Sequence, residues 1–396
     1  MKKILIHVFL SLIMSAQAYA GEINGEIQSI LTRHYNQYKG IEYFSGISLA
    51  VSSPLVPTWR FYVGQTSHDQ SGNPIGESTL FSIGSITKSF TAVLILQLEA
   101  EKKLKLSDSV RDHLPGYPKW GHLTIEQLLN MSSGLPNYTD SPTMNYVASK
   151  ELEKQWTAEE LLGIVYPRNE TNPPLKPGYF YTNTGYLLSA LIIEKITGMS
   201  FKAALESRLL IPLKLNNTFY PIPKSTQNVQ ERLAGGYAYN QYENPELVGQ
   251  DIRNNNLSWA RAAGAIVSNP ADIIQWVDDV FIKDALLTKE EKQKMQKIIS
   301  VKTGLPINRT TAEDPKGFGL GIIQNYNSDI GRFWYYQGET LGYRALYMFV
   351  PCNRIIIATA INSATNGEND HAGELLQSVY SAILNQYPDY RCKDQS

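Results

Sequence analysis

The sequence predicts an α+β fold in which one sheet is built from both ends of the chain and a mostly helical domain is inserted between them. Strand-like segments occur near the N-terminus, at residues 46–51 and 59–63, and return only after residue 333. The region between them, from about residue 85 to 300, carries apolar residues at helical spacing instead. Because a sheet must bury a face against another layer, this order favours one sheet domain with a helical insertion. Ligand sites usually form where two such domains meet.

The individual elements follow from periodicity. A first amphipathic helix is predicted over residues 23–39, because Ile27, Ile30, Leu31 and Tyr35 recur at helical spacing. The two early strands are joined through a segment that contains two prolines. Further helices are predicted at residues 85–103, 124–131, 186–197 and 270–281. The late strands are predicted at residues 333–336, 345–350 and 355–360, and a last helix at residues 372–384.

The N-terminus has the pattern of a secretory signal peptide. Lys2 and Lys3 precede an apolar run from Ile4 to Met14, and the small-x-small tripeptide Ala18–Ala20 ends it. The run is shorter than the roughly 20 apolar residues that a membrane span needs. We therefore expect residues 1–20 to be removed and the mature protein to be periplasmic or secreted, without stable membrane insertion. The sheet domain is then expected to comprise residues 21–84 and about 301–396, and the helical domain about 85–300.

Composition excludes several classes of partner. Lys and Arg number 36 against 37 Asp and Glu, so no polybasic field is present and no nucleic-acid partner is expected. Two cysteines are too few for a cysteine-rich zinc module. In an oxidising compartment Cys352 and Cys392 are candidates for a disulfide, worth about 4 kcal/mol for a loop of this length. Two free thiols are the alternative.

The most informative motif is Ser85-x-x-Lys88, which occurs once in the chain, at the start of a long apolar segment. Residues i and i+3 share a helical face, so the amine can reach the hydroxyl. A serine hydroxyl needs a base to become a nucleophile, and a buried lysine can serve because burial lowers its pKa. The N-terminus of the helix favours a developing oxyanion. Taken alone, a serine at a helix start followed by a solvated lysine is a common structural arrangement.

A second cluster, Tyr181-x-Asn183, stands just before another apolar helix. A tyrosine beside a lysine can carry protons, and an asparagine amide can orient a substrate carbonyl or hold the lysine. By itself this pair is equally consistent with a structural turn whose aromatic ring only contributes to packing.

Together the two clusters and their context resemble the serine β-lactamase-related family, which includes class C β-lactamases, D-Ala-D-Ala carboxypeptidases, D-aminopeptidases and related esterases. Further stretches look similar to the same family, in the expected order: Leu123–Pro136, Gly264–Asp272 and Gly317–Gly321. The resemblance covers about residues 41 to 385. It implies an antiparallel sheet with flanking helices, a catalytic cleft beside the helical domain, and no cofactor or metal.

The resemblance also implies residue roles. Ser85 would be the acyl-accepting nucleophile, Lys88 its activating amine, and Tyr181 the proton shuttle. Asn183 would orient the substrate, and the backbone N–H groups of Ser85 and Glu339 would form the oxyanion hole.

The third motif departs from the family pattern. The family has Lys-or-His-x-Gly on a strand that lines the site, whereas this chain has Tyr336-Gln337-Gly338. A neutral phenol replaces the cation that helps to hold a substrate carboxylate. Arg344 is a candidate to supply that charge if its side chain reaches the cleft, and a surface arginine on a strand is the alternative. Some esterases of the family have an aromatic residue at the position of Tyr336.

These observations predict an exported serine hydrolase that acts through an acyl-enzyme. A D-Ala-D-Ala carboxypeptidase-like or β-lactamase-like activity is favoured, on a small molecule or a peptide from peptidoglycan, with β-lactams as further candidates. A carboxylesterase or D-aminopeptidase of the same family is the alternative, and a non-catalytic protein that binds cell-wall fragments is the alternative of another class. The chain has neither Gly-x-Ser-x-Gly nor His-Glu-x-x-His, which disfavours a Ser-His-Asp triad and a zinc hydrolase.

Overall fold

The computed structural model describes residues 22–392, except residues 55, 70, 168–174, 241–243 and 366. The predicted signal peptide therefore lies outside the described residues. Within the part of the chain that is described, no helix has the length and apolar character needed to cross a membrane.

The main sheet has nine strands in the order β2-β1-β12-β11-β10-β9-β8-β6-β7, and its strand pairs are antiparallel. Two strands come from the N-terminal segment, β1 (Gly46–Ser53) and β2 (Val56–Gly64). The others follow the helical region: β6 (Ile298–Ser300), β7 (Pro306–Ile307), β8 (Lys316–Phe318), β9 (Ile323–Asn327), β10 (Gly331–Thr340), β11 (Tyr343–Val350) and β12 (Ile355–Ile361). β1 pairs with β12, with Ile47 opposite Ile361, so the two ends of the chain meet inside one sheet. The predicted α+β class with an antiparallel sheet is confirmed.

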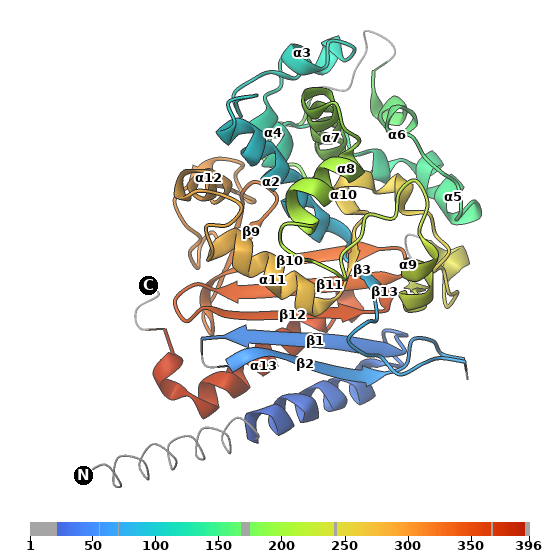
Figure 1. Ribbon diagram of the computed structural model, residues 1–396, viewed down its shortest axis with the longest axis vertical. Coiled ribbons are helices and arrows are strands. Elements are labelled where there is room, and N and C mark those ends of the chain that lie inside the picture. The colour runs from blue at the N-terminus through green and yellow to red at the C-terminus, as the bar shows by residue number, and fades with distance from the viewer. Residues whose placement is uncertain are drawn as a thin grey trace.

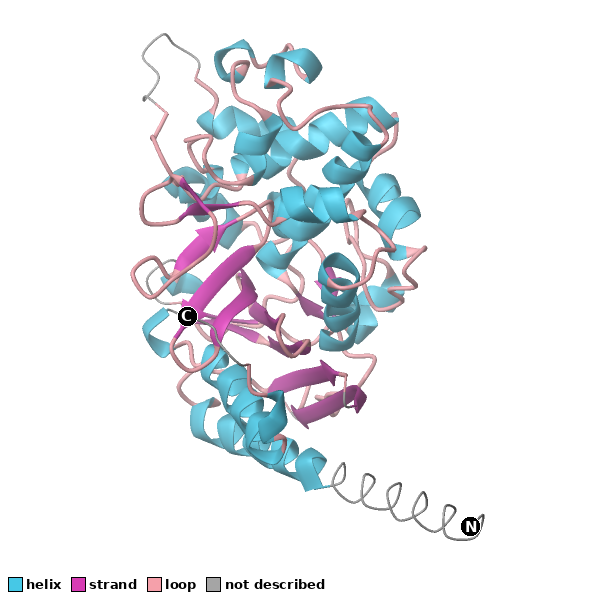
Figure 2. Cartoon of the chain, turned by 90° about the vertical axis from the view of Figure 1, so that its left-hand side faces the viewer, coloured by secondary structure: helices cyan, strands magenta, loops and turns pink. Residues whose placement is uncertain are grey.

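Helices cover both faces of this sheet (Figure 2). One face is covered by the helix at residues 22–38 and by α13 (Ala372–Gln386), which lie together beside β1 and β2 in Figure 1. The opposite face receives α11 (Pro270–Phe281) and the helical region. Successive residues of β1 point to opposite faces, so Leu49 joins the first core and Ala50 the second. This double cover explains why β11 and β12 are buried along their whole length.

The helical region surrounds α2 (Thr87–Ala100), which is buried on nearly every side. Its other helices are α3 (Val110–His113), α4 (Ile125–Leu129), α5 (Pro142–Lys150), α6 (Ala158–Val165), α7 (Thr184–Thr197), α8 (Phe201–Leu205), α9 (Gln227–Arg232), α10 (Arg261–Gly264) and α12 (Lys289–Met295). Two small sheets join this region to the rest, one formed by β3 (Phe81–Ser82) with β5 (Val267–Ser268), the other by β4 (Tyr237–Tyr239) with β13 (Ser363–Thr365).

The predicted helix at residues 270–281 is α11 with the same bounds, and the predicted long strands lie within β1, β2, β10, β11 and β12. Two features differ. Ser85 lies in a 3₁₀ turn, Gly84–Ile86, and the α-helix begins only at Thr87. The strands β3–β9 and β13 were not predicted, because segments of two to five residues are too short for a period-2 pattern. The predicted domain boundaries stay a prediction, and α11, from the predicted helical domain, packs against the sheet.

Cys352 and Cys392 form a disulfide, with their Cα atoms 5.8 Å apart. The bond joins the turn between β11 and β12 to the segment that follows α13. It therefore fastens the end of the described chain to the sheet.

Candidate active site

Two glycines bring the turn that holds Ser85 against strand β10. Gly84 has φ +47°, and a Cβ there would lie 2.4 Å from the backbone nitrogen of Glu339. A Cβ on Gly338 would lie 1.9 Å from the carbonyl oxygen of Ile83 and 2.7 Å from the Ser85 nitrogen. No other residue type fits such an approach without moving the backbone. The backbone of Ser85 and that of the third motif are thus neighbours.

Ser85 Oγ is contacted by both predicted proton carriers. Lys88 Nζ donates to it over 2.9 Å and to the carbonyl oxygen of Ala263 over 2.8 Å. Tyr181 Oη donates to the same Oγ over 2.7 Å. Two side chains, one from each motif, therefore converge on the Ser85 hydroxyl oxygen, at distances that allow direct proton transfer.

Lys88 is fully buried, and none of its described contacts is a carboxylate. Burial lowers the pKa of its amine, and the nearby Tyr181 opposes that shift. The amine also lies over the rings of Tyr181 and Tyr186, at 4.9 and 5.4 Å from their centroids. Burial therefore makes the neutral amine, which can accept a proton, more accessible than in a solvated lysine, whereas the two rings favour the ammonium.

The pKa of Tyr181 is lowered, although burial by itself raises the pKa of a tyrosine. Burial raises the pKa of its hydroxyl, but the charge of Lys88 and hydrogen bonds from the surrounding groups lower it by more, so the net shift is downward. The pKa values of Lys88 and Tyr181 are therefore both lowered, and both groups lie within proton-transfer distance of Ser85 Oγ.

The family-like stretches hold these residues in place. The Phe180 N–H donates to the Met131 carbonyl over 2.8 Å, and Thr184 Oγ1 donates to the Pro136 carbonyl over 2.6 Å, which fixes the segment around Tyr181. Gly321 packs so closely on α2 that a Cβ would lie 2.7 Å from the Lys88 carbonyl.

Asn183 makes no described contact with Lys88. Its Nδ2 donates to Thr139 Oγ1 over 3.1 Å, and its backbone N–H donates to Asn137 Oδ1 over 3.0 Å. Its amide nitrogen is thus engaged by the protein, whereas its residue lines the cavity beside the nucleophile. Of the two roles considered for Asn183, holding the lysine is not seen and contact with substrate remains.

The third motif and the residue that follows it lie partly in the protein interior and partly at the cleft. Tyr336 is 1% exposed, and its Oη is buried without a hydrogen-bond partner among the described residues. Gln337 donates to Asp370 and accepts a hydrogen bond from Tyr335 Oη over 2.9 Å. Glu339 is exposed and lines the cavity. Neither Tyr336 nor Gln337 is among the residues that line this cavity, and a role of either in substrate binding stays a prediction.

The expectation that Arg344 supplies a positive charge to the cleft is wrong. Its side chain is completely buried and forms ion pairs with Glu42 and Asp370, each at 2.7 Å. Its Nε also donates to the Ser363 carbonyl over 2.8 Å. A buried guanidinium needs such partners because an unpaired buried charge is very costly, and Glu42 lies far away in sequence, where no local pattern shows it.

A cavity of about 530 Å³ is lined by Asn183, two residues after Tyr181, and by Glu339, whose backbone lies against Gly84, whereas Ser85, Lys88 and Tyr181 are not among its lining residues. Its lining is polar: two carboxylates, four asparagine amides and several hydroxyls, with no Lys, Arg or His among the described residues that line it. The full lining is Thr139, Asp140, Asn145, Asn183, Ala238, Asn240, Asn244, Trp259, Glu339, Thr340, Leu341, Ala364, Thr365 and Gly367. Apart from Asn183 and Glu339 these residues were not predicted, because they come from separate loops, turns, helices and strand ends that carry no motif. Elsewhere in the described chain, no group of three or more potential metal ligands is found.

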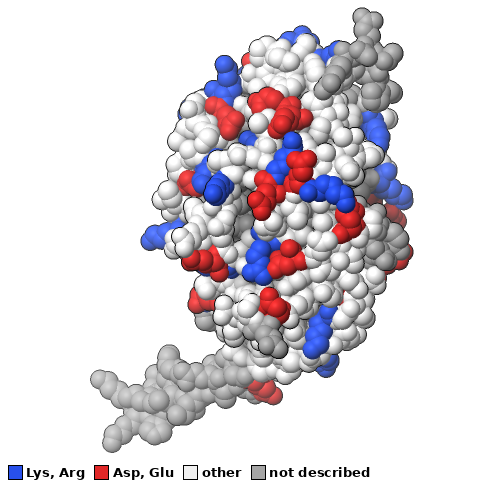
Figure 3. All heavy atoms as spheres, turned by 90° about the vertical axis from the view of Figure 1, so that its right-hand side faces the viewer, with Lys and Arg blue, Asp and Glu red and all other residues white. Residues whose placement is uncertain are grey.

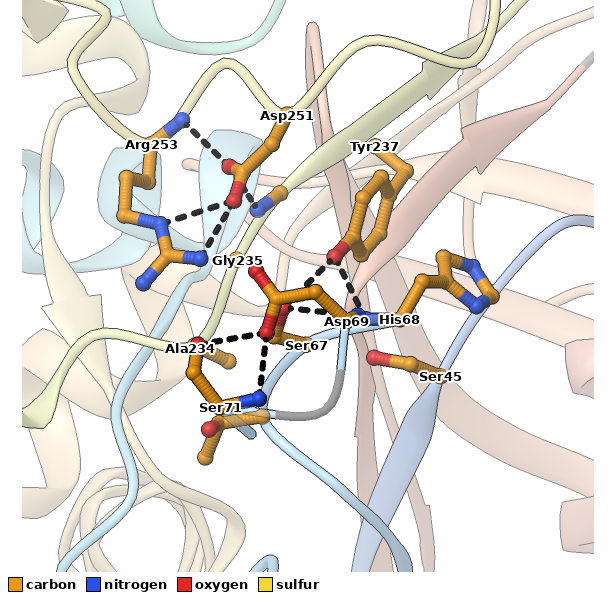
Figure 4. A network of polar contacts seen from close by, with 12 residues as sticks. Ser45, Ser67, His68, Asp69, Ser71, Ala234, Gly235, Tyr237, Asp251 and Arg253 are labelled. Carbon is orange, nitrogen blue, oxygen red and sulfur yellow. Dashed lines mark hydrogen bonds and ion pairs between the residues drawn. The ribbon is translucent and has the colours of Figure 1, made fainter. Parts of the chain in front are cut away.

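A polar network supports the wall of this cavity that is formed by β4 (Figure 4). The His68 N–H donates to Tyr237 Oη over 2.8 Å, and the Gly236 N–H donates to Asp251 Oδ1 over 3.1 Å. Arg253 Nε donates to the other oxygen of Asp251 over 2.8 Å. The strand that precedes Asn240 is therefore fixed by two neighbouring loops.

Comparisons with known proteins show what this chain is similar to. The sequence model of the family described as Beta-lactamase matches residues 34–380. Penicillin-binding protein 4* of Bacillus subtilis (strain 168) is 27% identical over 308 residues, which cover 76% of this chain and 64% of the relative. Teichoic acid D-alanine hydrolase of Staphylococcus aureus is 31% identical over 198 residues, which cover 50% of this chain and 44% of the relative. The chain thus spans less than two thirds of the length of either relative.

Two solved structures have a similar fold over nearly their whole length. The D-amino acid amidase from Ochrobactrum anthropi SV3 superposes with a TM-score of 0.76 at 26% identity, covering 92% of this chain and 99% of the amidase. The D-stereospecific amidohydrolase from a Streptomyces species superposes with a TM-score of 0.71 at 24% identity, covering 91% and 97%. The second likeness concerns the fold alone.

Proposed function

Because this chain belongs to the beta-lactamase family and is a serine hydrolase, we propose that it forms an acyl-enzyme at Ser85 and hydrolyses amides or esters of D-amino acids. The observation that carries the proposal is the convergence of Lys88 Nζ and Tyr181 Oη on Ser85 Oγ, at 2.9 and 2.7 Å. A serine held between two proton carriers whose pKa values are both lowered is an activated nucleophile.

Acylation uses that arrangement directly. The Ser85 hydroxyl proton passes to the Lys88–Tyr181 pair as Oγ attacks the substrate carbonyl carbon. The negative charge that develops on the carbonyl oxygen is stabilised by the N–H groups of Ser85 and Glu339 and by the N-terminus of α2. Tyr181 then gives the proton to the departing nitrogen or oxygen, and the bond to the leaving group breaks.

Deacylation repeats these steps with water as the nucleophile. A water molecule gives one proton to the Lys88–Tyr181 pair and attacks the ester carbon. Ser85 Oγ leaves, takes the proton back and regenerates the free hydroxyl. The product is the carboxylic acid of the acyl group, so no cofactor is required by the balance of the reaction.

The polarity of the cleft supports the choice of substrate. The third motif offers a buried phenol, and Arg344 is engaged by two carboxylates, so the cation expected for binding a substrate carboxylate is missing from the described lining. The names of two relatives point the same way, since one is a D-amino acid amidase and the other a teichoic acid D-alanine hydrolase. A D-Ala-D-Ala carboxypeptidase-like or β-lactamase-like activity is the second candidate, and the likeness to the penicillin-binding protein of Bacillus subtilis favours it.

The compartment belongs to the same proposal. The N-terminal pattern of lysines, apolar run and Ala18–Ala20 supports export and cleavage after Ala20. The disulfide between Cys352 and Cys392 supports an oxidising compartment such as a periplasm.

The test is an intact-mass and turnover experiment on the mature protein and its Ser85→Ala variant. D-Alanine esters, D-phenylalanine amide, an N-acyl-D-Ala-D-Ala peptide and benzylpenicillin are offered separately. We expect turnover of the D-amino acid derivatives and its loss, by at least about 10³-fold, in Ser85→Ala. Unchanged turnover in Ser85→Ala would overturn the assignment. Turnover of only the peptide or the penicillin would move the second candidate to first place, and binding without turnover would favour a non-catalytic sensor.

A further inference from the structure

We propose that Asn137 is a positioning residue for Asn183, the residue of the second motif that is left with a role in substrate contact. Asn137 directly follows the family-like stretch Leu123–Pro136 and has no role in the mechanism above. The inference rests on the proposed function and deepens it, because it names the side chain that sets where Asn183 stands relative to the substrate.

Asn137 binds the backbone of Asn183 directly. The Asn183 N–H donates to Asn137 Oδ1 over 3.0 Å, and Asn137 is 9% exposed. Asn183 is the residue before α7, and its own side chain makes no capping hydrogen bond to that helix. The first N–H groups of a helix have no acceptor within the helix, so they depend on acceptors from elsewhere. The oxygen of the Asn137 amide therefore fixes the point from which the Asn183 side chain projects.

The neighbours of the Asn137 amide permit only one orientation of it. Its Nδ2 donates to Asp140 Oδ1 over 2.7 Å, at the end of the amide away from Asn183. An ionised carboxylate only accepts hydrogen bonds, so the amide nitrogen must face Asp140 and the oxygen must face the Asn183 N–H. Asp140 forms no ion pair and no other side-chain hydrogen bond with a described residue. The carboxylate thus serves to hold the amide of Asn137 in place.

The same turn also holds the side chain of Asn183. Its Nδ2 donates to Thr139 Oγ1 over 3.1 Å, so residues 137 and 139 bind the backbone and the side chain of Asn183 at once. Thr139, Asp140 and Asn183 line the cavity, whereas Asn137 is not among its lining residues. Asn137 therefore acts on a substrate through these neighbours and not by touching it.

Tyr181, two residues before Asn183, is held by separate contacts. The N–H of the residue before it donates to the Met131 carbonyl over 2.8 Å, and its own hydroxyl donates to Ser85 Oγ over 2.7 Å. Removal of the Asn137 amide should therefore move Asn183 more than it moves the phenol of Tyr181. The loss should appear in the binding of the substrate and not in the activation of the nucleophile.

The test uses two variants at the turn and one control. Asn137→Leu is similar in shape and removes both hydrogen bonds. Asn137→Asp/Asp140→Asn exchanges the two side chains, so an acceptor again faces the Asn183 N–H and a donor and an acceptor again face each other. The control is Asn327→Leu, because Asn327 Oδ1 accepts from the Ile330 N–H over 2.7 Å in the turn between β9 and β10.

Two substrates separate positioning from activation. The larger one is D-phenylalanine amide, or the N-acyl-D-Ala-D-Ala peptide if only that one is turned over by wild type. The smaller one is p-nitrophenyl acetate, whose acyl group carries no polar atom beyond the carbonyl that Asn183 could bind. Both kcat and KM are measured for each protein, and urea unfolding checks that each variant is folded.

With the larger substrate we expect Asn137→Leu to lower kcat/KM by at least about tenfold, mainly through a higher KM, because a displacement of about 1 Å misplaces a substrate contact. The exchanged pair should stay within about threefold of wild type. Turnover of p-nitrophenyl acetate should stay within about threefold in every variant, and Asn327→Leu should keep the wild-type KM. If Asn137→Leu does not fold, Asn137→Ala replaces it with the same expectations.

The inference is overturned by a wild-type KM in Asn137→Leu, or by an exchanged pair that is no better than Asn137→Leu. Equal losses with both substrates also overturn it, because Asn137 would then support the nucleophile or the fold as a whole. The same rise in KM in Asn327→Leu would have this effect too. Failure of the proposed function looks different, because wild type would then show no turnover of either substrate that Ser85→Ala abolishes.

Discussion

Tyr336 stands at a motif position where the family has a cation, and its surroundings indicate a different role for it. The sequence places a phenol where the family has a cation, and the structure buries that phenol against Phe318, with ring centroids 6.1 Å apart. Phe318 also contacts the ring of Tyr181, at 6.3 Å. The Tyr336 hydroxyl is one of the groups that lower the pKa of Tyr181, after the larger effects of Lys88. Tyr336 is therefore expected to tune the proton carrier rather than to bind a carboxylate.

Replacing Tyr336 by Phe should raise the pKa of Tyr181, because the phenolate form loses a donor while burial still disfavours it. The limb of the kcat/KM profile that rises with pH should move to higher pH, by about one pH unit if the nearby Tyr336 hydroxyl stabilises the phenolate by about 1.4 kcal/mol. The measurement is kcat/KM of both proteins on one substrate between pH 5 and 10. Tyr179→Phe, which removes another hydroxyl beside Phe318, is the control and should leave the profile in place. A Tyr336→Phe profile that coincides with wild type would show that the hydroxyl does not act on Tyr181.

At the scale of elements, the sequence predicts features that depend on local patterns better than features that depend on long-range contacts. The Ser85-x-x-Lys88 and Tyr181-x-Asn183 clusters carry chemical meaning within a few residues, and apolar periodicity located α11 and the long strands. The cavity wall has no such signal, because Thr139, Asp140 and Thr365 lie on loops and short strands that only tertiary contacts bring together. The backbone carbonyl of Ala263 accepts a hydrogen bond from Lys88, and every residue has such a carbonyl. No sequence pattern singles it out.

The contact between β10 and the Ser85 turn yields an element-scale prediction. Gly338→Ala would place a Cβ 1.9 Å from the Ile83 carbonyl oxygen, so strand and turn must separate. We expect turnover to fall by at least about 10²-fold, because a displacement of about 1 Å is enough to misplace the reacting groups. The variant should still fold, with a lower unfolding midpoint.

The matched substitution is Gly373→Ala in α13, where a Cβ would meet nothing within 4 Å. Alanine is the better helix former, so this variant should keep full activity and gain about 0.5–1 kcal/mol in unfolding free energy. Turnover and urea unfolding of the two variants provide the comparison. Wild-type turnover in Gly338→Ala would mean that the close approach is not needed for catalysis.

For the whole molecule, the buried ion pairs of Arg344 connect segments from both ends of the chain. Glu42 precedes β1, Arg344 lies on β11, and Asp370 precedes α13. The backbone N–H of His371 donates to the Glu42 carboxylate over 3.0 Å, and the ring Nδ1 of His371 lies 2.8 Å from the same carboxylate. Charges are mixed elsewhere, and the face of the molecule shown in Figure 3 has both signs interspersed over its surface. The organised charges are thus inside, where they fix how the termini meet.

Glu42→Gln should destabilise the fold by about 3 kcal/mol, since it leaves Arg344 buried with one carboxylate fewer. Glu101→Gln is the surface counterpart: it weakens the ion pair with Arg208 and should cost about 1 kcal/mol or less. Urea unfolding at pH 7 measures the change in unfolding free energy for both variants. Equal and small losses in the two variants would show that the buried network does not hold the termini together.

The same region should make the stability of the whole protein depend on pH. His34, on the helix at residues 22–38, is 7% exposed, and its ring contacts that of Tyr38 in a tilted arrangement, with ring centroids 4.7 Å apart. Burial lowers its pKa from 6.5 to about 4, more than the opposing attraction of Glu374 raises it. Between these two pKa values the unfolded chain binds a proton that the folded protein does not, so stability is full above about pH 6.5 and is lost as pH falls toward 4.

His34 alone should account for a loss of about 3 kcal/mol over that interval. His34→Gln, which carries no titrating group, should flatten the decline by the same amount while the carboxylates still contribute theirs. The measurement is the urea unfolding free energy of both proteins at pH 4, 5, 6 and 7, and the difference between their slopes isolates His34. Parallel curves would mean that His34 is equally easy to protonate in the folded and unfolded chains, which is incompatible with its burial in the folded protein.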